Sequence, residues 1–203
     1  MELFKNAILL TGGIATGKSS VCNFLKLHGF PVIDADKIAH EVLNESSSEI
    51  AKLFGEKFVK DGKVDRKALG ELIFSSKKDK KALENLLHPK IKERIEEEAL
   101  KLERYKVPYI VDIPLFFETG EKYKIEPVVV VYAPRETQLK RLIEREGYDE
   151  KHALERINAQ IDIEEKKKRA DFVIDNSKDI KHLQKEVDRF LDFVRGRYAG
   201  IKI

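Results

Sequence analysis

The sequence contains no tryptophan, one methionine and one cysteine, Cys22. A single cysteine cannot form a disulfide within the chain, which favours a reducing compartment, and we expect the cytoplasm. No apolar run approaches the length of about 18 residues that a membrane-spanning helix needs, so we expect no membrane partner. The first residues also lack the basic and small-residue pattern of a signal peptide.

A large excess of one charge is missing as well. The 39 basic and 36 acidic residues leave a net charge of +3. Nucleic-acid-binding proteins usually gather basic residues on one face, so this balance predicts no nucleic-acid partner. With 203 residues, of which 42% are hydrophobic, the chain can bury a sizeable core in one or two domains. Nothing in the sequence indicates an obligate protein partner.

Short apolar runs alternate with helical patterns along the chain. Each run is followed by polar or turn residues, which is typical of strands in a parallel α/β sheet. Three runs and two shorter candidates predict strands at 7–10, 109–111 and 128–132, and at 32–33 and 172–174. We therefore predict an α/β fold with a three-layer, doubly wound, five-stranded parallel sheet.

Other intervals have helical spacing. Between 38 and 106 apolar residues recur at helical spacing with no strand-like run, which predicts a helical insertion. Pro89 in this interval predicts a kink or a restart of the helix. A charged helical stretch occupies 136–169, and an amphipathic helix is predicted from 179 to 198. The remaining segments, 1–37, 107–135 and 170–203, then form the core that contains the sheet.

A phosphate-binding motif lies at 12–19, where GGIATGKS matches G-x-x-x-x-G-K-[ST] between a predicted strand and a predicted helix. Backbone N–H groups in such a P-loop surround phosphates, and the helix N-terminus adds favourable charge. Lys18 would reach the β- and γ-phosphates, and the Ser19 hydroxyl would bind Mg²⁺. We expect ATP and Mg²⁺ as cofactors, with the nucleotide contacted by Gly12, Gly13, Ile14, Ala15, Thr16, Gly17, Lys18, Ser19 and Ser20.

Three aspartates follow predicted strands. Asp34 and Asp36 come directly after the strand at 32–33, at the sheet edge where α/β proteins bind ligands. One carboxylate there could accept the proton of an attacking hydroxyl while its neighbour holds Mg²⁺. Alternatively, both are solvated, and one caps the following helix. Asp112 ends the strand at 109–111, where a metal-binding acid is expected, although it could also cap a turn. The predicted metal ligands are thus Ser19, Asp34 and Asp112.

The charged stretch at 136–169 contains several arginines. Arg141 and Arg145 are one helical turn apart, and Arg156 follows. In a kinase such residues neutralise the charge of the transferring phosphoryl group. A basic helix by itself is usually a solvated face, but the P-loop upstream favours the catalytic interpretation. No two of the five histidines have metal-ligand spacing, so we predict no zinc site.

Together these segments resemble the dephospho-coenzyme A kinase family. The matching pieces are LTGGI (10–14), GKS (17–19), VIDAD (32–36), AH (39–40), DR (65–66), LLHP (86–89), DIPLFFE (112–118), QLKR (138–141), AD (170–171) and VIDN (173–176). They cover nearly the whole chain in the right order. The resemblance implies a kinase that uses ATP to phosphorylate the ribose 3′-hydroxyl of dephospho-coenzyme A, the last step of coenzyme A biosynthesis.

The family's division of labour implies roles for the parts of this chain. The core would bind ATP, the insertion 38–106 would bind the acceptor, and 136–169 would be a lid. Lys18 and the lid residues Arg141 and Arg156 look catalytic. Asp36 looks like the catalytic base, supported by Asp34. Further residues that look like parts of the acceptor site are His88, Pro89, Pro114, Leu115 and Phe116.

Two further positions are informative within this resemblance. The loop after Asn176 is where adenine would pack. Ala15 stands where the family commonly has glycine, which implies that this position need not have a positive φ angle.

Two alternatives remain at this stage. Another small-molecule P-loop kinase, for a nucleoside, nucleotide or shikimate-like acceptor, would need an insertion that fits a compact acceptor. A nucleotide-dependent switch would hydrolyse slowly and bind partners. A GTPase switch should carry an N-K-x-D sequence, and residues 176–179 (NSKD) only approach it.

Overall fold

The computed structural model describes residues 2–120 and 123–198, which divide into two compact units. The first unit comprises Met1–Ile33 and Ala99–Ile203, and the second comprises Asp34–Glu98. The predicted core segment 170–203 therefore ends with residues 199–203 outside the described part. Among the described residues, no helix combines the length and apolar character needed to span a membrane.

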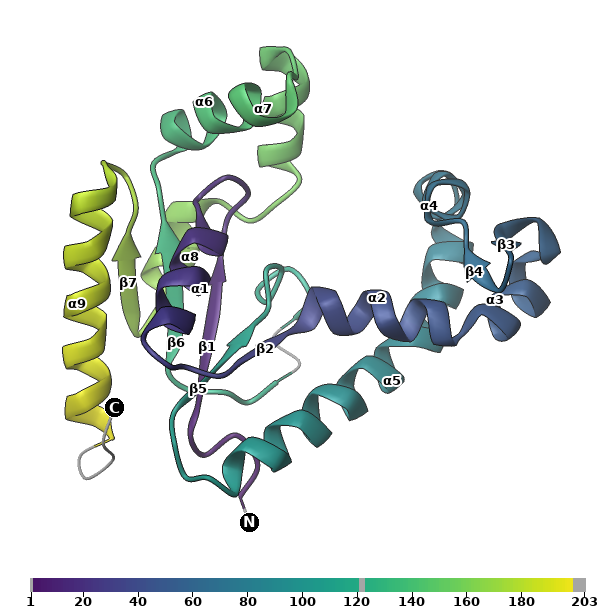
Figure 1. Cartoon of the computed structure of the whole chain (residues 1–203). Coiled ribbons are helices and arrows are strands. Elements are labelled where there is room, and N and C mark those ends of the chain that lie inside the picture. The colour runs from purple at the N-terminus through teal and green to yellow at the C-terminus, as the bar shows by residue number, and fades with distance from the viewer. Residues whose placement is uncertain (1, 121–122, 199–203) are drawn as a thin grey trace. The chain divides into compact units, whose positions relative to one another are not determined.

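A five-stranded sheet forms the centre of the first unit (Figure 1), with the order β2-β5-β1-β6-β7. Its strands are β1 (Ala7–Gly12), β2 (Val32–Asp34), β5 (Tyr109–Asp112), β6 (Val128–Tyr132) and β7 (Phe172–Asp175). Parallel pairing joins β1 to β5, β1 to β6 and β6 to β7. All five predicted strands are confirmed. The chain continues to one side of β1 and later crosses to the other, so the residues after β1 occupy the ligand-binding position of such sheets.

Helices cover both faces of this sheet. The helices α1 (Lys18–Leu27) and α9 (Ile180–Arg197) contact each other on one face. Because side chains alternate along a strand, every second strand residue, such as Ile8 and Leu10, joins the core under these helices. The short helix α8 (Ile163–Lys168) contacts β6 and is drawn behind the sheet in Figure 1. The predicted three-layer α/β class is confirmed.

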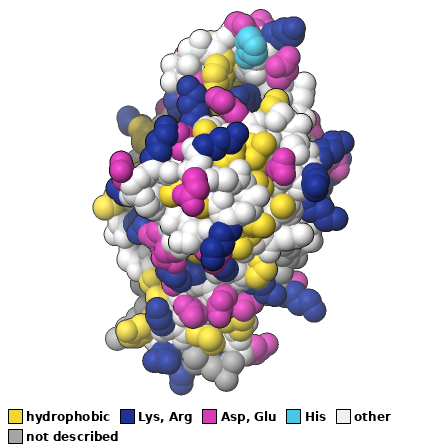
Figure 2. All heavy atoms as spheres, turned by 90° about the vertical axis from the view of Figure 1, so that its right-hand side faces the viewer, with side chains coloured by type: hydrophobic (Ala, Val, Ile, Leu, Met, Phe, Trp, Pro, Cys, Tyr) yellow, Lys and Arg dark blue, Asp and Glu magenta, His cyan; other side chains and the backbone are white. Residues whose placement is uncertain are grey.

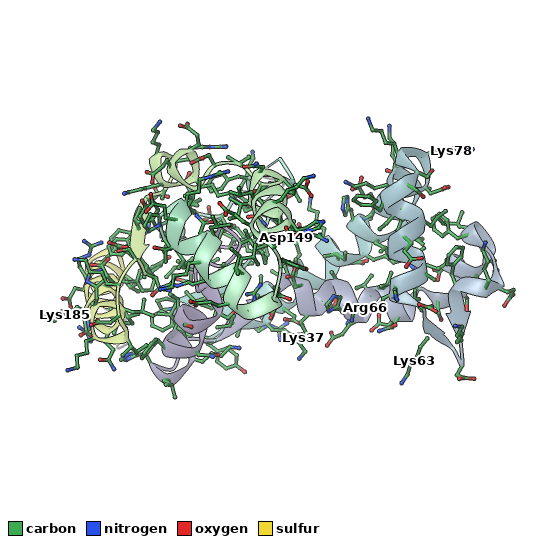
Figure 3. The ribbon with its side chains drawn as sticks, turned by 90° about the horizontal axis from the view of Figure 1, so that it is seen from above. Lys37, Lys63, Arg66, Lys78, Asp149 and Lys185 are labelled. Atoms are coloured by element: carbon green, nitrogen blue, oxygen red, sulfur yellow. The ribbon has the colours of Figure 1, made fainter. Side chains whose placement is uncertain are left out.

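Two further helices, α6 (Arg135–Glu146) and α7 (Glu150–Asn158), lie between β6 and β7 in the chain. They pack together through a small core of Leu142, Ala153 and Ile157, and the P-loop residues Ile14 and Ala15 pack against it. The N-cap of α7 is Asp149, labelled in Figure 3, whose carboxylate accepts a hydrogen bond from the backbone N–H of His152. The predicted charged helical stretch therefore consists of three helices, with α8 as the third.

The second unit is mainly helical. Its elements are α2 (Ala35–Glu45), α3 (Ser47–Phe54), the 3₁₀ helix η1 (Glu56–Phe58), β3 (Val59–Lys60), β4 (Lys63–Val64), α4 (Arg66–Ser75) and α5 (Lys77–Glu103), which runs on into the first unit. The expectation of no strand here is wrong, because β3 and β4 form an antiparallel hairpin. Asp61 and Gly62 have positive φ angles in its turn, as Asp-Gly hairpin turns require. The strands are too short to show as an apolar run.

Pro89 lies inside α5, so the predicted restart of the helix at this position is wrong. A proline inside a helix removes one backbone hydrogen bond. The helix nevertheless continues for more than three turns after Pro89, where Ile95 and Ala99 are buried. Burial of this apolar side compensates for the lost hydrogen bond.

Basic and acidic side chains are interspersed over the face drawn in Figure 2. This distribution agrees with the near balance of 39 basic and 36 acidic residues. In Figure 3 the labelled lysines, such as Lys63 on the hairpin and Lys185 on α9, point away from the ribbon. Their surface positions are the usual ones for long charged side chains.

Candidate active site at the P-loop

The loop between β1 and α1 has the shape of a phosphate-binding loop. Gly17, the N-cap of α1, adopts the left-handed conformation with φ 85°. A Cβ at Gly17 would lie 2.1 Å from Asn176 Nδ2, so only glycine fits. Asn176 follows β7 and donates a hydrogen bond to the carbonyl of Thr16 at 2.8 Å. The end of β7 therefore fixes the loop where it turns into the helix.

Ala15 has φ 58°, also in the left-handed region. The expectation that a residue with a methyl group here need not have a positive φ is therefore wrong. An alanine in this conformation costs about 1 kcal/mol because Cβ approaches the carbonyl oxygen. The loop keeps this strained conformation because Ala15 itself and the adjacent Ile14 pack on the small core of α6 and α7.

Lys18 and Asp112 form an ion pair next to the loop. The register between β1 and β5 places Asp112 beside Leu10, so its carboxylate reaches the first residue of α1. Lys18 Nζ lies 2.5 Å from Oδ1 and 2.6 Å from Oδ2 of Asp112. Both side chains are largely shielded from water, which strengthens the charge-assisted hydrogen bonds. The structure thus brings together the predicted lysine and the predicted strand-end acid.

Cys22 also belongs to this cluster. Its Sγ donates to Asp112 Oδ2 at 3.2 Å from one turn further along α1. Burial first, and then the negative charge of Asp112, raise the pKa of the Cys22 thiol to about 12. The thiol is therefore protonated at neutral pH and acts as a hydrogen-bond donor to Asp112.

A cavity of about 350 Å³ adjoins the loop. The residues that line it come from the P-loop and α1, from α6, and from the segment after β7: Ala15, Gly17, Ser20, Arg141, Arg145, Asn176, Lys178, Ile180 and Leu183. Arg141 Nη1 is buried and has no hydrogen-bond partner among the residues that the structure describes. It lies 3.8 Å from the position that a Cβ of Gly17 would occupy. A guanidinium nitrogen that is shielded from water beside a phosphate-binding loop suits an anionic ligand.

The other predicted residues of the first unit differ in whether they line this cavity. Ser19 is exposed at the start of α1, and Ser20 lines the cavity. Arg156 is exposed on α7 and does not line it in the described part of the chain. Arg145 does line it and also pairs with Glu146 at 2.7 Å.

The predicted acceptor residues of the first unit follow β5. Thr11 Oγ1 donates to the carbonyl of Pro114 at 3.1 Å, which ties this loop to β1. Leu115 is 41% exposed. Phe116 is buried and packs edge-to-face on Phe117. Leu115 is therefore the more accessible of the two hydrophobic side chains.

The remaining predicted residues belong to the second unit. Asp34 is the N-cap of α2, and its carboxylate accepts a hydrogen bond from the backbone N–H of Lys37 at 2.9 Å. This is the capping arrangement that the sequence left open as an alternative. Asp36 is exposed in the first turn of α2, and His88 and Pro89 lie side by side in sequence on α5.

Sequence reasoning missed two side chains that contact the loop, Gln160 and Lys166. Gln160 lies in a connection with no motif of its own. Lys166 lies in a basic run, which is usually a solvated face. Only a knowledge of which distant segments meet could have identified them.

The comparisons with known proteins agree with this geometry. A family model described as Dephospho-CoA kinase matches residues 6–182. The chain is 52% identical to a protein of that name from Sulfurimonas denitrificans, over 98% of this chain and 99% of the other. The corresponding Helicobacter pylori (strain J99) protein is 46% identical over 93% and 97%.

Solved structures give the same result. The structure of dephospho-CoA kinase from Campylobacter jejuni has a TM-score of 0.78 at 39% identity, covering 95% of this chain and 98% of that one. The structure of TT1252 from Thermus thermophilus has a TM-score of 0.79 at 34% identity, covering 92% and 96%.

Proposed function

The chain belongs to the dephospho-CoA kinase family, and we propose that Lys18, Arg141 and Asp36 are the main residues of its phosphoryl transfer. The protein is a kinase that transfers a phosphoryl group from ATP to an alcohol, the ribose 3′-hydroxyl of dephospho-coenzyme A. This reaction completes coenzyme A biosynthesis.

The observation that carries the assignment is the charge arrangement at the P-loop. Asp112 holds Lys18 at the end of β5. The buried Nη1 of Arg141 lies near Gly17 and has no hydrogen-bond partner among the described residues. Phosphoryl transfer asks little covalent chemistry of the protein, so positioning and neutralisation of charge account for most of the catalysis. Two cations next to one loop supply that neutralisation.

Lys18 would contact the β- and γ-phosphates of ATP, and the backbone of residues 12–20 would surround them. Arg141 would neutralise negative charge on the phosphoryl group as it transfers. Arg156, exposed on α7, would take part if the segment 136–169 acts as a lid. Adenine would pack near Asn176, which lines the cavity.

The acceptor hydroxyl needs a base, and Asp36 fits that task by its exposed carboxylate in the first turn of α2. It would orient the 3′-hydroxyl and accept its proton. Asp34 would support Asp36 or the metal. His88, Pro89, Pro114, Leu115 and Phe116 would form the acceptor site, with residues 38–106 as the acceptor domain and 136–169 as the lid.

The chemistry of the predicted donors, one hydroxyl and two carboxylates, suits Mg²⁺. This ion usually takes one or two carboxylates and completes its shell with water and substrate phosphates. The hydroxyl of Ser19 and the carboxylates of Asp34 and Asp112 are the donors that would hold it. No group of three or more His, Cys, Asp or Glu side chains that could hold a metal ion occurs among the described residues, and Mg²⁺ in a kinase requires none. When bound, the ion would neutralise charge on the β- and γ-phosphates.

The experiment that tests the function is direct. Purified protein is incubated with ATP, Mg²⁺ and dephospho-coenzyme A, and the products are followed by mass spectrometry. Coenzyme A appearing in equal amount with ADP is the expected result. ADP without coenzyme A would contradict the assignment of dephospho-coenzyme A as the acceptor, and other small-molecule acceptors would then be tested. ATP binding without turnover of any acceptor would contradict the kinase assignment and favour a switch.

The single buried thiol of Cys22 is consistent with a cytoplasmic enzyme.

A further inference from the structure

Lys166 is fully buried, although it begins a run of four basic residues at 166–169. The next three residues of the run, Lys167, Lys168 and Arg169, are exposed. An ammonium group is costly to bury unless charged and polar partners surround it. The contacts of Lys166 therefore explain why this lysine, and not its neighbours, points into the protein.

The ammonium group of Lys166 contacts two oxygen atoms. Lys166 Nζ donates to the carbonyl oxygen of Gly12 at 2.9 Å and lies 2.6 Å from Glu118 Oε1. Gly12 is both the last residue of β1 and the first residue of the P-loop motif. Glu118 ends the DIPLFFE segment, which begins at the last residue of β5. One side chain of α8 thus connects the two loops that leave neighbouring strands of the sheet.

The connection before α8 contacts the same two loops. Gln160 Oε1 accepts a hydrogen bond from the backbone N–H of Ile14 at 2.8 Å. The backbone N–H of Ile161 donates to Glu118 Oε1 at 3.1 Å. The P-loop is therefore held at Gly12 and at Ile14 from one short segment, and Glu118 anchors that segment.

We propose that Lys166 is a positioning residue for phosphoryl transfer, which together with Gln160 holds the P-loop backbone in its reactive geometry. The proposal rests on the role of the P-loop given under the proposed function. A buried ion pair adds little net stability compared with apolar side chains of similar size, so stability alone does not account for this pair. A displacement of about 1 Å in an active site can lower the rate about 100-fold, so positioning does account for it.

Glu118 allows positioning to be separated from stability. Its Oε2 is buried and has no hydrogen-bond partner in the described part of the chain, so Lys166 is the main compensation for its charge. The single variant Lys166→Met leaves that charge unpaired and should destabilise the fold. The double variant Lys166→Met/Glu118→Gln removes both charges and should regain most of the stability. The double variant still lacks the hydrogen bond that Lys166 Nζ donates to the carbonyl of Gly12.

The experiment measures urea unfolding, kcat and KM for ATP in the full-length protein. We expect the double variant to unfold near the urea midpoint of the native protein, yet to have a kcat about 100-fold lower. KM for ATP should change far less than kcat. Lys167→Met, in the same helix but exposed, is the matched control and should leave kcat and KM unchanged. A double variant that regains both stability and kcat would overturn the proposal, because Lys166 would then serve packing alone.

Gln160→Leu tests the second contact without touching a buried charge. Gln160 is only partly buried, so this variant keeps the test available if both Lys166 variants fail to fold. We expect the same lowering of kcat, with KM for ATP nearly unchanged. An unaltered kcat would overturn the positioning role. Native protein that made no coenzyme A in the same assay would instead contradict the proposed function, so the two failures are distinguishable.

Discussion

Lys18 Nζ lies 2.5 Å from Asp112 Oδ1, so the first residue of α1 is joined to the last residue of β5. Because β5 pairs directly with β1, this contact ties the start of α1 back to the strand next to β1, so the P-loop is fixed at both of its ends. The ion pair fixes the lysine that would meet the phosphates, and it provides that lysine with an anionic partner inside the protein.

Asp112→Asn should lower the free energy of unfolding by about 2 kcal/mol, because the largely shielded ammonium of Lys18 loses a charged partner. The loss should be smaller with a non-hydrolysable ATP analogue in EDTA, because the phosphates then supply the negative charge. Urea unfolding with and without the analogue measures both values. Asp188→Asn, exposed on α9, is the control and should change neither. An equal loss under the two conditions would contradict a contact between Lys18 and the phosphates.

Asp36→Asn should lower turnover about 100-fold or more, because an amide cannot accept the proton of the 3′-hydroxyl. ATP affinity should stay close to that of the native protein, because the carboxylate is assigned to the acceptor. Steady-state kinetics gives kcat, and calorimetry gives the ATP dissociation constant. Asp61→Asn, in the exposed hairpin turn, is a matched control because asparagine also tolerates a positive φ. Equal losses of turnover and of ATP affinity would rule out Asp36 as the catalytic base.

Gly17→Ala should weaken ATP binding more than about tenfold, a change of about 1.4 kcal/mol. The new methyl group would meet Asn176 Nδ2 at 2.1 Å, and φ 85° is strained for alanine. Relief of the clash has to move Asn176 or the start of α1, and either movement alters the loop. Gly196→Ala, in α9 with open space around the new methyl group, should bind ATP normally. Native-like ATP binding by Gly17→Ala would show that the loop tolerates the displacement.

Ala15→Gly should leave stability within about 0.5 kcal/mol of the native value, because relief of strain at φ 58° offsets the entropy that glycine loses on folding. The same replacement inside a helix costs about 1 kcal/mol, so Ala82→Gly in α5 is the comparison. Thermal and urea unfolding of the two variants measure the difference. A loss of stability in Ala15→Gly as large as that in Ala82→Gly would show that the backbone at Ala15 is not strained.

The Cys22 thiol should resist alkylation in the folded protein up to high pH. Its pKa of about 12 lies above the ordinary value of 9.0, mainly through burial and then through Asp112. Between these two values the unfolded chain binds fewer protons than the folded protein, so stability falls as pH rises through that range. Cys22→Ala should lose less stability there than the native protein. An alkylation rate that already rises near pH 9 without unfolding would contradict the raised pKa.

Much of the fold could be predicted from local patterns. The five strands, the helix from 179 to 198 and the phosphate-binding loop all depend on residues close together in the sequence. Apolar runs, helical spacing and the glycines of the motif record these features directly, because each reflects backbone geometry over a few residues. The hairpin at β3 and β4 was missed because two-residue strands leave almost no pattern, although Asp61 and Gly62 carried its turn signal.

The sequence by itself determined the chemistry of the site, because Lys18 and the glycines of the loop bind phosphate through groups set by the motif. Only the tertiary structure decided which distant side chains hold that loop. Asn176, Gln160 and Lys166 contact its backbone from more than 140 positions away. Such contacts follow from the order of strands in the sheet and from burial, and a basic run gives no sign of which lysine turns inward. The physical reason is that packing selects among residues that look alike in sequence.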